Sequence, residues 1–509
     1  MAYQAVESPS VQQSSVPVST RKLQHSVDAR LDALEPRLSS FYVRLLLLTG
    51  VSWAIQAVEL ALLVFTRFLV ANDIGMGTPV LEIFGASIFM GAMAGGPIFG
   101  HIADRFGRRL ALVIAMVFSL GGLVVSARAS AGYMLIIGRV VAGLGFGGQL
   151  SSTVVLIQEF TPQSMRGRMV SLLDAFTGIG GLAGLALAYV VAPRLEWRTT
   201  YLVTCGLVLH AVVLRFTVPE SPRWLTSVGR TEEAIAIVEK IENSHVRQTP
   251  ENGILKEELD FSTGLESPSS TAKPSRLQKT VPTLVIWILW IAMTMSSYAL
   301  GIYVPTLISL NGYNVFASWR TIGTLNIAQV VGSCVASTVV DTFGPRRSFA
   351  AFAMMTTIFS VALSYAAWCK AIVIGVSFVV TALLSACWSC VLTHTPGYYS
   401  TSHRGRGMGY AVGVSRLAAV GGCYLYPHMF NVWVLSVPVL CWVFGGILAV
   451  VAVGIVPHFG YQPLSQGDTS DLGAWEVTEL ESGTKSSDTT ENSPSGIERV
   501  DVDETRQSL

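Results

Sequence analysis

About twelve apolar stretches of helix-spanning length lie between Leu45 and Pro457, and they constrain the fold of this chain more than any other feature. Only an apolar run of roughly 20 residues crosses a bilayer as a helix, because every backbone polar group must be satisfied inside the segment. Charged residues make up 13% of the chain, about half their share in soluble domains. The sequence therefore predicts an all-α membrane protein. We expect spans near 42–70, 80–102, 109–127, 133–157, 167–193, 199–218, 283–310, 318–341, 347–368, 371–396, 405–430 and 432–457.

Two kinds of basic joint between these spans occur twice. The segment 100–109 reads GHIADRFGRR and the segment 341–347 reads DTFGPRR, with their aspartates 237 positions apart. The segments 166–168 and 404–406, both Arg-Gly-Arg, repeat at an offset of 238. Two unrelated joints displaced by nearly the same distance indicate a duplicated unit of six helices. The sequence thus predicts twelve transmembrane helices in two six-helix halves, an organisation typical of transporters whose halves rock against each other.

The distribution of basic residues predicts the orientation in the membrane. Cytoplasmic loops carry an excess of Lys and Arg, and the two sets of joints differ strongly in this respect. One set holds few basic residues, namely Arg128, Arg194, Arg198 and Lys370. We therefore expect both termini in the cytoplasm, on the side of the set that contains Arg105, Arg108, Arg109, Arg166, Arg168, Arg346, Arg347, Arg404 and Arg406.

The termini differ in composition from the helical part. Residues 458–509 hold eleven acidic and three basic side chains without apolar periodicity, so we expect an acidic, disordered cytoplasmic tail. Residues 1–41 form a polar cytoplasmic segment without a signal-peptide core, so the first span is expected to be an uncleaved signal-anchor.

The long internal connection, 219–282, separates an N-terminal six-helix bundle (42–218) from a C-terminal one (283–457). Within it Thr231, the acidic pair after it, and apolar residues at 234, 235, 238 and 241 predict an amphipathic helix on the cytoplasmic face. The Ser-, Thr-, Pro- and Lys-rich stretch 262–279 is typical of a flexible linker.

These joints and several span motifs resemble the major facilitator superfamily over nearly all of 42–457. The glycine, Asp-Arg and Gly-Arg-Arg pattern of 100–109 is similar to the loop signature of that superfamily. Gly138-Arg139, Glu159-x-x-Pro162 with Arg166, and the segment 219–225 (PESPRWL) resemble its sugar-porter and organic-ion groups. The segment 52–60 (SWAIQAVEL), and His394-Thr395-Pro396 paired with the glycines from 407 on, resemble the branch related to synaptic-vesicle proteins.

Some positions depart from these patterns. Gln56 stands where the branch usually has Asp, and Gly397 and Ser400 stand where it has Glu and Pro. In helix five Gly180-Gly181 replaces an amide that binds sugar in sugar porters, and helix seven lacks their tandem amides. A hexose substrate is therefore disfavoured.

The joint residues have two interpretations. In one, they fix the topology and contact lipid headgroups. In the other, the carboxylate of Asp104 lies near basic residues and a neighbouring helix terminus and forms an interdomain latch that breaks when the halves rock. The resemblance favours the latch, and Asp341 with Arg346 and Arg347 is its expected equivalent in the second half. The gating group then comprises Asp104, Arg105, Arg108, Arg109, Glu159, Arg166, Asp341, Arg346, Arg347 and Arg404.

Three charged residues within the first-half spans are candidates for proton coupling. Glu59 lies in the middle of span one, where a carboxylate costs a few kcal/mol on insertion scales and must face a cavity or a partner. Its expected partner is Arg139, about six residues into span four, and the pair would loosen when Glu59 is protonated. Asp174 in span five is the other intramembrane carboxylate. The alternative for each carboxylate is a purely structural role, in which its hydrogen bonds are satisfied within the protein.

Arg416, within span eleven, is the candidate for holding a substrate carboxylate. The alternative is that its side chain reaches the cytoplasmic headgroups. Gln56 lies on one polar stripe of span one with Trp53 and Glu59 and is a candidate wall of the pathway. Three aromatic residues are candidates for stacking on a flat substrate, although aromatic side chains more often only pack: Tyr298, Tyr303 and Trp388.

The leading functional prediction is proton-coupled symport of a small organic anion, an aromatic or short-chain carboxylate, by a monomer. A sugar or polyol transporter and a non-transporting membrane sensor or vesicle-resident binding protein are the alternatives. An ATP-driven pump and an enzyme are disfavoured, because the chain has no Walker sequence and no cluster with metal or nucleophile spacing. We expect no cofactor and no nucleic-acid partner. The plasma membrane is the expected location, with a vesicle or vacuole as alternatives.

Overall fold

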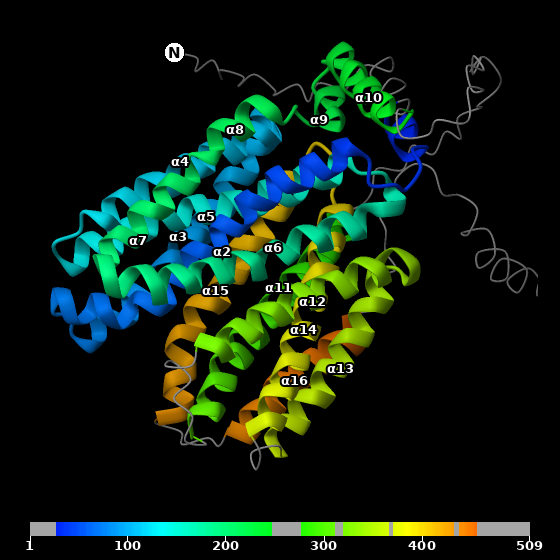
Figure 1. Cartoon of the computed structure of the whole chain (residues 1–509). Helices are drawn as coiled ribbons and strands as arrows, with labels where there is room; N and C mark the ends of the chain where they lie inside the picture. The colour runs from blue at the N-terminus through cyan, green and yellow to red at the C-terminus, as the bar shows by residue number, and fades with distance from the viewer. Residues whose placement is uncertain (1–26, 247–275, 311–318, 366–369, 432–436, 456–509) are drawn as a thin grey trace, which may run out of the picture. The chain divides into compact units, whose positions relative to one another are not determined.

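The computed structural model describes residues 27–246, 276–310, 319–365, 370–431 and 437–455, and these are almost entirely helical (Figure 1). This confirms the predicted all-α fold. In the first half the membrane helices are α2 (Ser40–Ile74), α3 (Thr78–Phe106), α4 (Arg108–Ala127), α5 (Gly132–Phe160) and α6 (Arg166–Ala186), followed by η2 (Leu187–Val191), α7 (Ala192–Val208) and α8 (His210–Thr217). In the second half they are α11 (Arg276–Leu310), α12 (Trp319–Phe343), α13 (Pro345–Tyr365), α14 (Lys370–His394), α15 (Arg404–Asn431) and α16 (Val437–Ile455).

Nine helical runs in the described part of the chain are long and apolar enough to cross a membrane. One of them, Gln163–Thr217, is long enough for two crossings. Within it Leu195 and Glu196 leave the helical conformation, and Glu196 has a φ of 67°. This kink separates predicted spans five and six. With α15 and the shorter apolar α16, the arrangement is consistent with twelve spans.

The two halves contact each other through matching pairs of helices. In one pair α3 packs on α15, and in the other α6 packs on α12. The helix α14 also contacts α6. Glycines allow the backbones to approach closely: a Cβ atom on Gly100 would lie 2.5 Å from the carbonyl oxygen of Gly405, and one on Gly178 would lie 2.5 Å from that of Asn326. Small residues at helix contacts are typical of membrane bundles. The duplication in the sequence thus reappears as a duplicated packing contact.

Two short helices follow the first half, α9 (Pro222–Ser227) and α10 (Thr231–Val246). The Ser221 hydroxyl accepts a hydrogen bond from the Trp224 backbone N–H at 3.1 Å and caps α9. The α10 helix buries Ala234, Val238 and Ile241, as the apolar spacing predicts. Its Glu242 forms an ion pair with Arg30 at 2.7 Å.

Parts of the predicted organisation fall outside the described residues. These are residues 1–26, most of the predicted linker (262–275) and the acidic tail (458–509). The helix α11 begins at Arg276, inside the stretch predicted as linker and before the expected start of its span at 283. Leu, Gln and Lys are good helix formers, so residues 277–279 can extend the apolar helix by a turn.

Candidate functional site

Asp104 connects the two halves at the end of the bundle where the basic joints lie, which we call the basic end. Its carboxylate accepts hydrogen bonds from the backbone N–H groups of Gly405 and Arg406, both at 2.9 Å. These N–H groups belong to the first turn of α15, so they have no acceptor within the helix, and the helix dipole favours a negative charge there. The Arg108 guanidinium lies 3.4 Å from the same carboxylate. Asp104 of the first half thus caps a helix of the second half.

Asp341 makes the reciprocal contact. Its carboxylate accepts hydrogen bonds from the backbone N–H groups of Gly167 at 2.8 Å and Arg168 at 2.9 Å, in the first turn of α6. Arg346 is half-buried and Arg347 is exposed, and neither forms an ion pair with Asp341 in the described structure. The expected grouping of Asp341 with these arginines is therefore not what the structure shows. The helix terminus of the opposite half takes their place.

Glu159, at the C-terminal end of α5, makes further contacts with the second half beside the Asp104 cap. Its buried carboxylate pairs with Arg108 at 2.9 Å and with Arg404 at 3.4 Å. The Ser221 hydroxyl donates to it at 2.5 Å. Arg108 also donates to the backbone carbonyl of Thr401 at 2.5 Å. Charges from both halves therefore neutralise each other in one buried network.

The remaining basic residues of the first joint have separate partners. Arg109 donates to the carbonyl of Val218 at 3.0 Å, and Arg105 is exposed and lies against the Phe106 ring. Glu220 accepts hydrogen bonds from the Arg108 and Arg109 backbone N–H groups at 2.9 and 3.1 Å. Burial raises the pKa of the Glu220 carboxyl, and these N–H groups oppose that effect.

The segment before α2 adds an acidic contact that the sequence analysis missed. Asp32 pairs with Arg223 at 2.9 Å and with Arg166 at 3.6 Å. Asp28 lies 3.5 Å from Arg223, and burial raises the pKa of its carboxyl while Arg223 lowers it. Nothing in the local pattern of residues 27–39 marks these aspartates, because their partners lie more than a hundred positions away.

Glu59 and Arg139 are both fully buried inside the first half. Neither Glu59 oxygen makes a hydrogen bond with a described residue. Arg139 donates from Nε to Ser126 at 3.0 Å and lies 4.6 Å from the centre of the Tyr201 ring, and its two terminal nitrogens lack hydrogen bonds among the described residues. The predicted ion pair is therefore not closed in this conformation.

Polar side chains of α2, α4 and α5 form a hydrogen-bonded chain inside the first half. The Gln149 amide donates to Ser119 at 2.7 Å, and the Gln56 amide donates to Gln149 at 3.5 Å. The polar stripe of span one predicts Gln56 as a site residue, but the sequence does not indicate Gln149 and Ser119. Gln149 follows a run of glycines and therefore resembles a packing segment in the sequence.

Arg416 lies between the two halves. Its guanidinium donates to the Tyr298 hydroxyl of α11 at 3.3 Å and lies 5.4 Å from the centre of the Phe146 ring of α5. The residue is 5% exposed and forms no ion pair with a described residue, so it does not reach the surface. Phe89 packs edge-on against Tyr298 with ring centres 5.3 Å apart. The result is a buried cation with aromatic neighbours from both halves.

Of the other two aromatic residues predicted to contact the substrate, Trp388 has a described side chain and Tyr303 does not. Trp388 donates to the Ser297 hydroxyl at 2.9 Å and packs edge-on against Trp290, with ring centres 5.4 Å apart. Trp388 is thus held within the second half, on α14, which packs against the helix α11 that carries Tyr298. Tyr303 lies in α11, but its side chain lies outside the described part of the structure.

Asp174 accepts hydrogen bonds from hydroxyl groups of both halves. The donors are Thr177 at 3.3 Å in the first half, and Ser333, Ser389 and Ser385 at 2.9, 3.0 and 3.4 Å in the second. A carboxylate inside an apolar span is evident from the sequence, but these serines are not. Their only local signal is the spacing of Ser385 and Ser389 by four positions, which places them on one face of α14.

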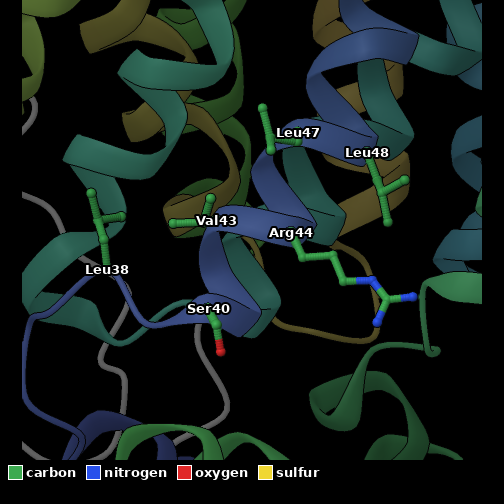
Figure 2. Close-up of a pocket in the computed structure, with 6 residues that line it drawn as sticks. All are labelled: Leu38, Ser40, Val43, Arg44, Leu47 and Leu48. Atoms are coloured by element: carbon green, nitrogen blue, oxygen red, sulfur yellow. The ribbon is translucent and has the colours of Figure 1, made fainter. Parts of the chain in front are cut away.

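A pocket on the surface of α2 is a poor candidate for the solute site. Figure 2 shows its lining residues, which all come from the segment 38–48, with apolar side chains around Arg44. Leu38, Val43 and Leu47 are each more than 40% exposed, as expected where a helix faces lipid. The pocket therefore suits a lipid chain better than a polar solute.

Two repeated helical halves, matched helix caps at the basic end and buried charges between the halves define a multi-pass membrane transporter of the major facilitator superfamily. The solved proton:xylose symporter XylE shares this fold, with a TM-score of 0.66, 19% identity, and coverage of 82% of this chain and 96% of that chain.

The chain belongs to the family of sugar (and other) transporters, which it matches over residues 49–464. It is similar to the niacin transporter NiaP of Acinetobacter baylyi, with 28% identity over 77% of this chain and 88% of the relative. It is also similar to the synaptic vesicle 2-related protein of Xenopus laevis, with 23% identity over 76% and 73% of the two chains.

Proposed function

We propose that the protein is a monomeric, proton-coupled symporter of a small organic anion, an aromatic or short-chain monocarboxylate. The observation that carries this proposal is Arg416, a buried guanidinium between the halves that has no acidic partner among the described residues. A buried charge without a partner costs several kcal/mol, and a carboxylate supplied by the substrate would remove that cost. The planar guanidinium binds a carboxylate through two parallel hydrogen bonds.

The surroundings of Arg416 favour a flat substrate. Tyr298 and Phe146 supply aromatic surface from both halves next to the cation, and Phe89 packs on Tyr298. A relative of the chain is named a niacin transporter. Niacin is a pyridine carboxylic acid, and it therefore combines a planar ring with one carboxylate. This agreement supports an aromatic monocarboxylate as the substrate, with Gln56, Tyr303 and Trp388 as further candidates for contact.

Glu59 and Arg139 are our candidates for proton coupling. Neither charge is compensated by a bonded partner in this conformation, although both are fully buried. Protonation of Glu59 removes the uncompensated negative charge, and closing of the Glu59–Arg139 pair compensates both charges. The two states therefore suit two conformations of the carrier. The polar chain through Ser119, Gln149 and Gln56 lies in the same half, and Gln56 is three positions before Glu59 on α2.

The gating role of the basic end follows from the two caps. Asp104 and Asp341 each bond to a helix of the opposite half, so opening this end requires both sets of hydrogen bonds to break. With both termini in the cytoplasm, as the basic residues predict, this structure is closed on the cytoplasmic side. We propose the plasma membrane as the location, with a vesicle or vacuole as alternatives.

A sugar or polyol is the second candidate, because the family description names sugar. The contacts of α6 argue against a hexose. A Cβ atom on Gly180 would lie 2.2 Å from the Ala54 backbone carbonyl oxygen, so the close packing of α6 on α2 opposes a larger side chain at that position.

Uptake into proteoliposomes tests the proposal. With a proton concentration that is higher outside than inside, nicotinate and benzoate serve as labelled anions, and xylose serves as the sugar. We expect accumulation of an aromatic monocarboxylate that disappears when a protonophore abolishes the gradient. Accumulation of xylose alone, or uptake of the anion that the gradient does not affect, would contradict the proposal.

A further inference from the structure

Asp174 lies in a cluster of oxygen atoms that three helices supply. From α6 come the two carboxylate oxygens and the Thr177 hydroxyl, from α12 the Ser333 hydroxyl, and from α14 the Ser385 and Ser389 hydroxyls. The Ser333 and Ser385 oxygens are 2.8 Å apart. The Ser385 hydroxyl also lies 3.0 Å from the backbone carbonyl oxygen of Gln329. We call these groups the Asp174 cluster.

The charge of the cluster is not balanced. No ion pair joins Asp174 to a Lys, Arg or His among the described residues, and its hydrogen-bond donors are all neutral hydroxyls. The residue is buried within the membrane helices, where an uncompensated carboxylate is costly. Hydroxyl donors reduce this cost but leave the net charge of −1. One positive charge balances the cluster, whereas a divalent ion would leave a positive excess.

We propose that the Asp174 cluster is a binding site for a monovalent metal cation, Na⁺. Hard cations without directional bonding are held by several carboxylate, hydroxyl and carbonyl oxygens, and this cluster offers that set from three helices. A proton needs only one oxygen and does not require four hydroxyls to converge. Thr177 is itself held by a 2.8 Å hydrogen bond from the Trp53 indole, which fixes one oxygen of the cluster from α2.

The site lies beyond the proton pair and the solute site of the proposed function. Its ligands come from both halves, so a bound Na⁺ favours the conformation in which α6 contacts α14. Opening of this contact removes Ser385 and Ser389 and leaves fewer oxygens for the ion. Na⁺ therefore stabilises the conformation seen here, independently of the solute.

Thermal unfolding of the purified full-length protein in detergent tests the site. The unfolding midpoint Tm is measured in NaCl, KCl and choline chloride at equal ionic strength, because general screening then cancels. We expect Tm to rise by a few degrees with Na⁺ and to saturate, as for any ligand that binds only the folded state. Asp174→Asn and Ser389→Ala should abolish this rise. Ser377→Ala is the matched control, because Ser377 lies on the same helix and, among the described residues, its hydroxyl bonds only to the Val373 carbonyl of its own turn at 2.6 Å.

If Ser389→Ala does not fold, Ser385→Ala and Ser333→Ala report on the same cluster. The proposal is overturned if Tm is equal in all three salts, if K⁺ acts as strongly as Na⁺, or if Asp174→Asn keeps the Na⁺ effect. A response to pH without a response to Na⁺ also overturns it. Because the readout is stability, it is separate from the uptake assay, and either proposal can fail without the other.

Discussion

Glu59 is the residue at which ion coupling can be separated from movement of the carrier. In Glu59→Gln the side chain keeps its shape and is permanently neutral, like the protonated acid. We expect the variant to lose accumulation driven by a pH gradient and to keep exchange of labelled for unlabelled solute, because the loaded carrier can still rock. Ser152→Ala, a buried change on α5, serves as the control. Accumulation equal to wild type in Glu59→Gln would exclude Glu59 as the coupling site.

Arg416 decides the class of solute. In Arg416→Lys the charge remains, but the two parallel hydrogen bonds to a carboxylate are lost. Hydrogen bonds to charged groups contribute about 1.5–3 kcal/mol, so the Kd for a monocarboxylate should rise at least about tenfold. Competition by monocarboxylates against labelled solute measures this change, with Arg128→Lys at an exposed joint as the control. Inhibition by hexoses alone, unchanged in Arg416→Lys, would show that the solute is not an anion.

At this scale the sequence reveals the charged members of the candidate site more readily than the neutral ones. A charged residue inside an apolar span stands out, and Glu59, Asp174 and Arg416 were selected for that reason. Ser333, Ser389 and Gln149 do not stand out, because a neutral polar side chain marks an apolar span less clearly than a charge does. Their positions depend on contacts between helices that are distant in the sequence.

Among the helices, α15 and α6 form the latch, because the N–H groups of their first turns donate to Asp104 and Asp341. In Asp104→Asn the first turn of α15 loses a charge-assisted cap, worth about 1–2 kcal/mol at a partly buried helix end. A change of that size shifts a two-state equilibrium about 5- to 30-fold. We expect slower turnover with nearly unchanged equilibrium affinity for the solute, because Asp104 lies at the basic end and not beside Arg416.

Asp73→Asn is the matched control for this latch. Asp73 also accepts hydrogen bonds at a helix end, from Trp197 at 3.1 Å and Arg198 at 2.8 Å, but both donors belong to its own half. Turnover and solute affinity are measured for both variants. A large loss of equilibrium binding in Asp104→Asn, with normal turnover, would contradict a role in gating.

The helices themselves follow from the apolar pattern, with most differences at their ends, although predicted span six is divided between α7 and α8. The start of α11 at Arg276 was missed, because charged and polar residues lower the hydropathy there without preventing a helix. The backbone N–H groups that donate to Asp104 and Asp341 were also not predictable in detail. The sequence indicated a helix terminus near Asp104, but for Asp341 it indicated arginines, and only the packing of α6 on α12 brings the Gly167 and Arg168 N–H groups to that carboxylate.

For the whole molecule, the repeat offset predicts two halves and the basic joints predict their orientation. The offset cannot predict which conformation the halves adopt, because that depends on the balance of weak contacts between them. Here the caps at Asp104 and Asp341 and the Glu159 network hold the basic end together. The orientation of that end in the membrane is the remaining prediction at this scale.

Labelling of single cysteines in intact cells tests this orientation. Glu239, on α10, and Ser130, in the joint between α4 and α5, are both exposed and lie on opposite sides in the predicted topology. After cysteine is introduced at either position, a membrane-impermeant maleimide added outside should label the Ser130→Cys variant only. Both variants should react once the cells are permeabilised, which controls for access. Labelling of the Glu239→Cys variant from outside would place α10 and the basic end outside the cell, and the latch would then close the extracellular side.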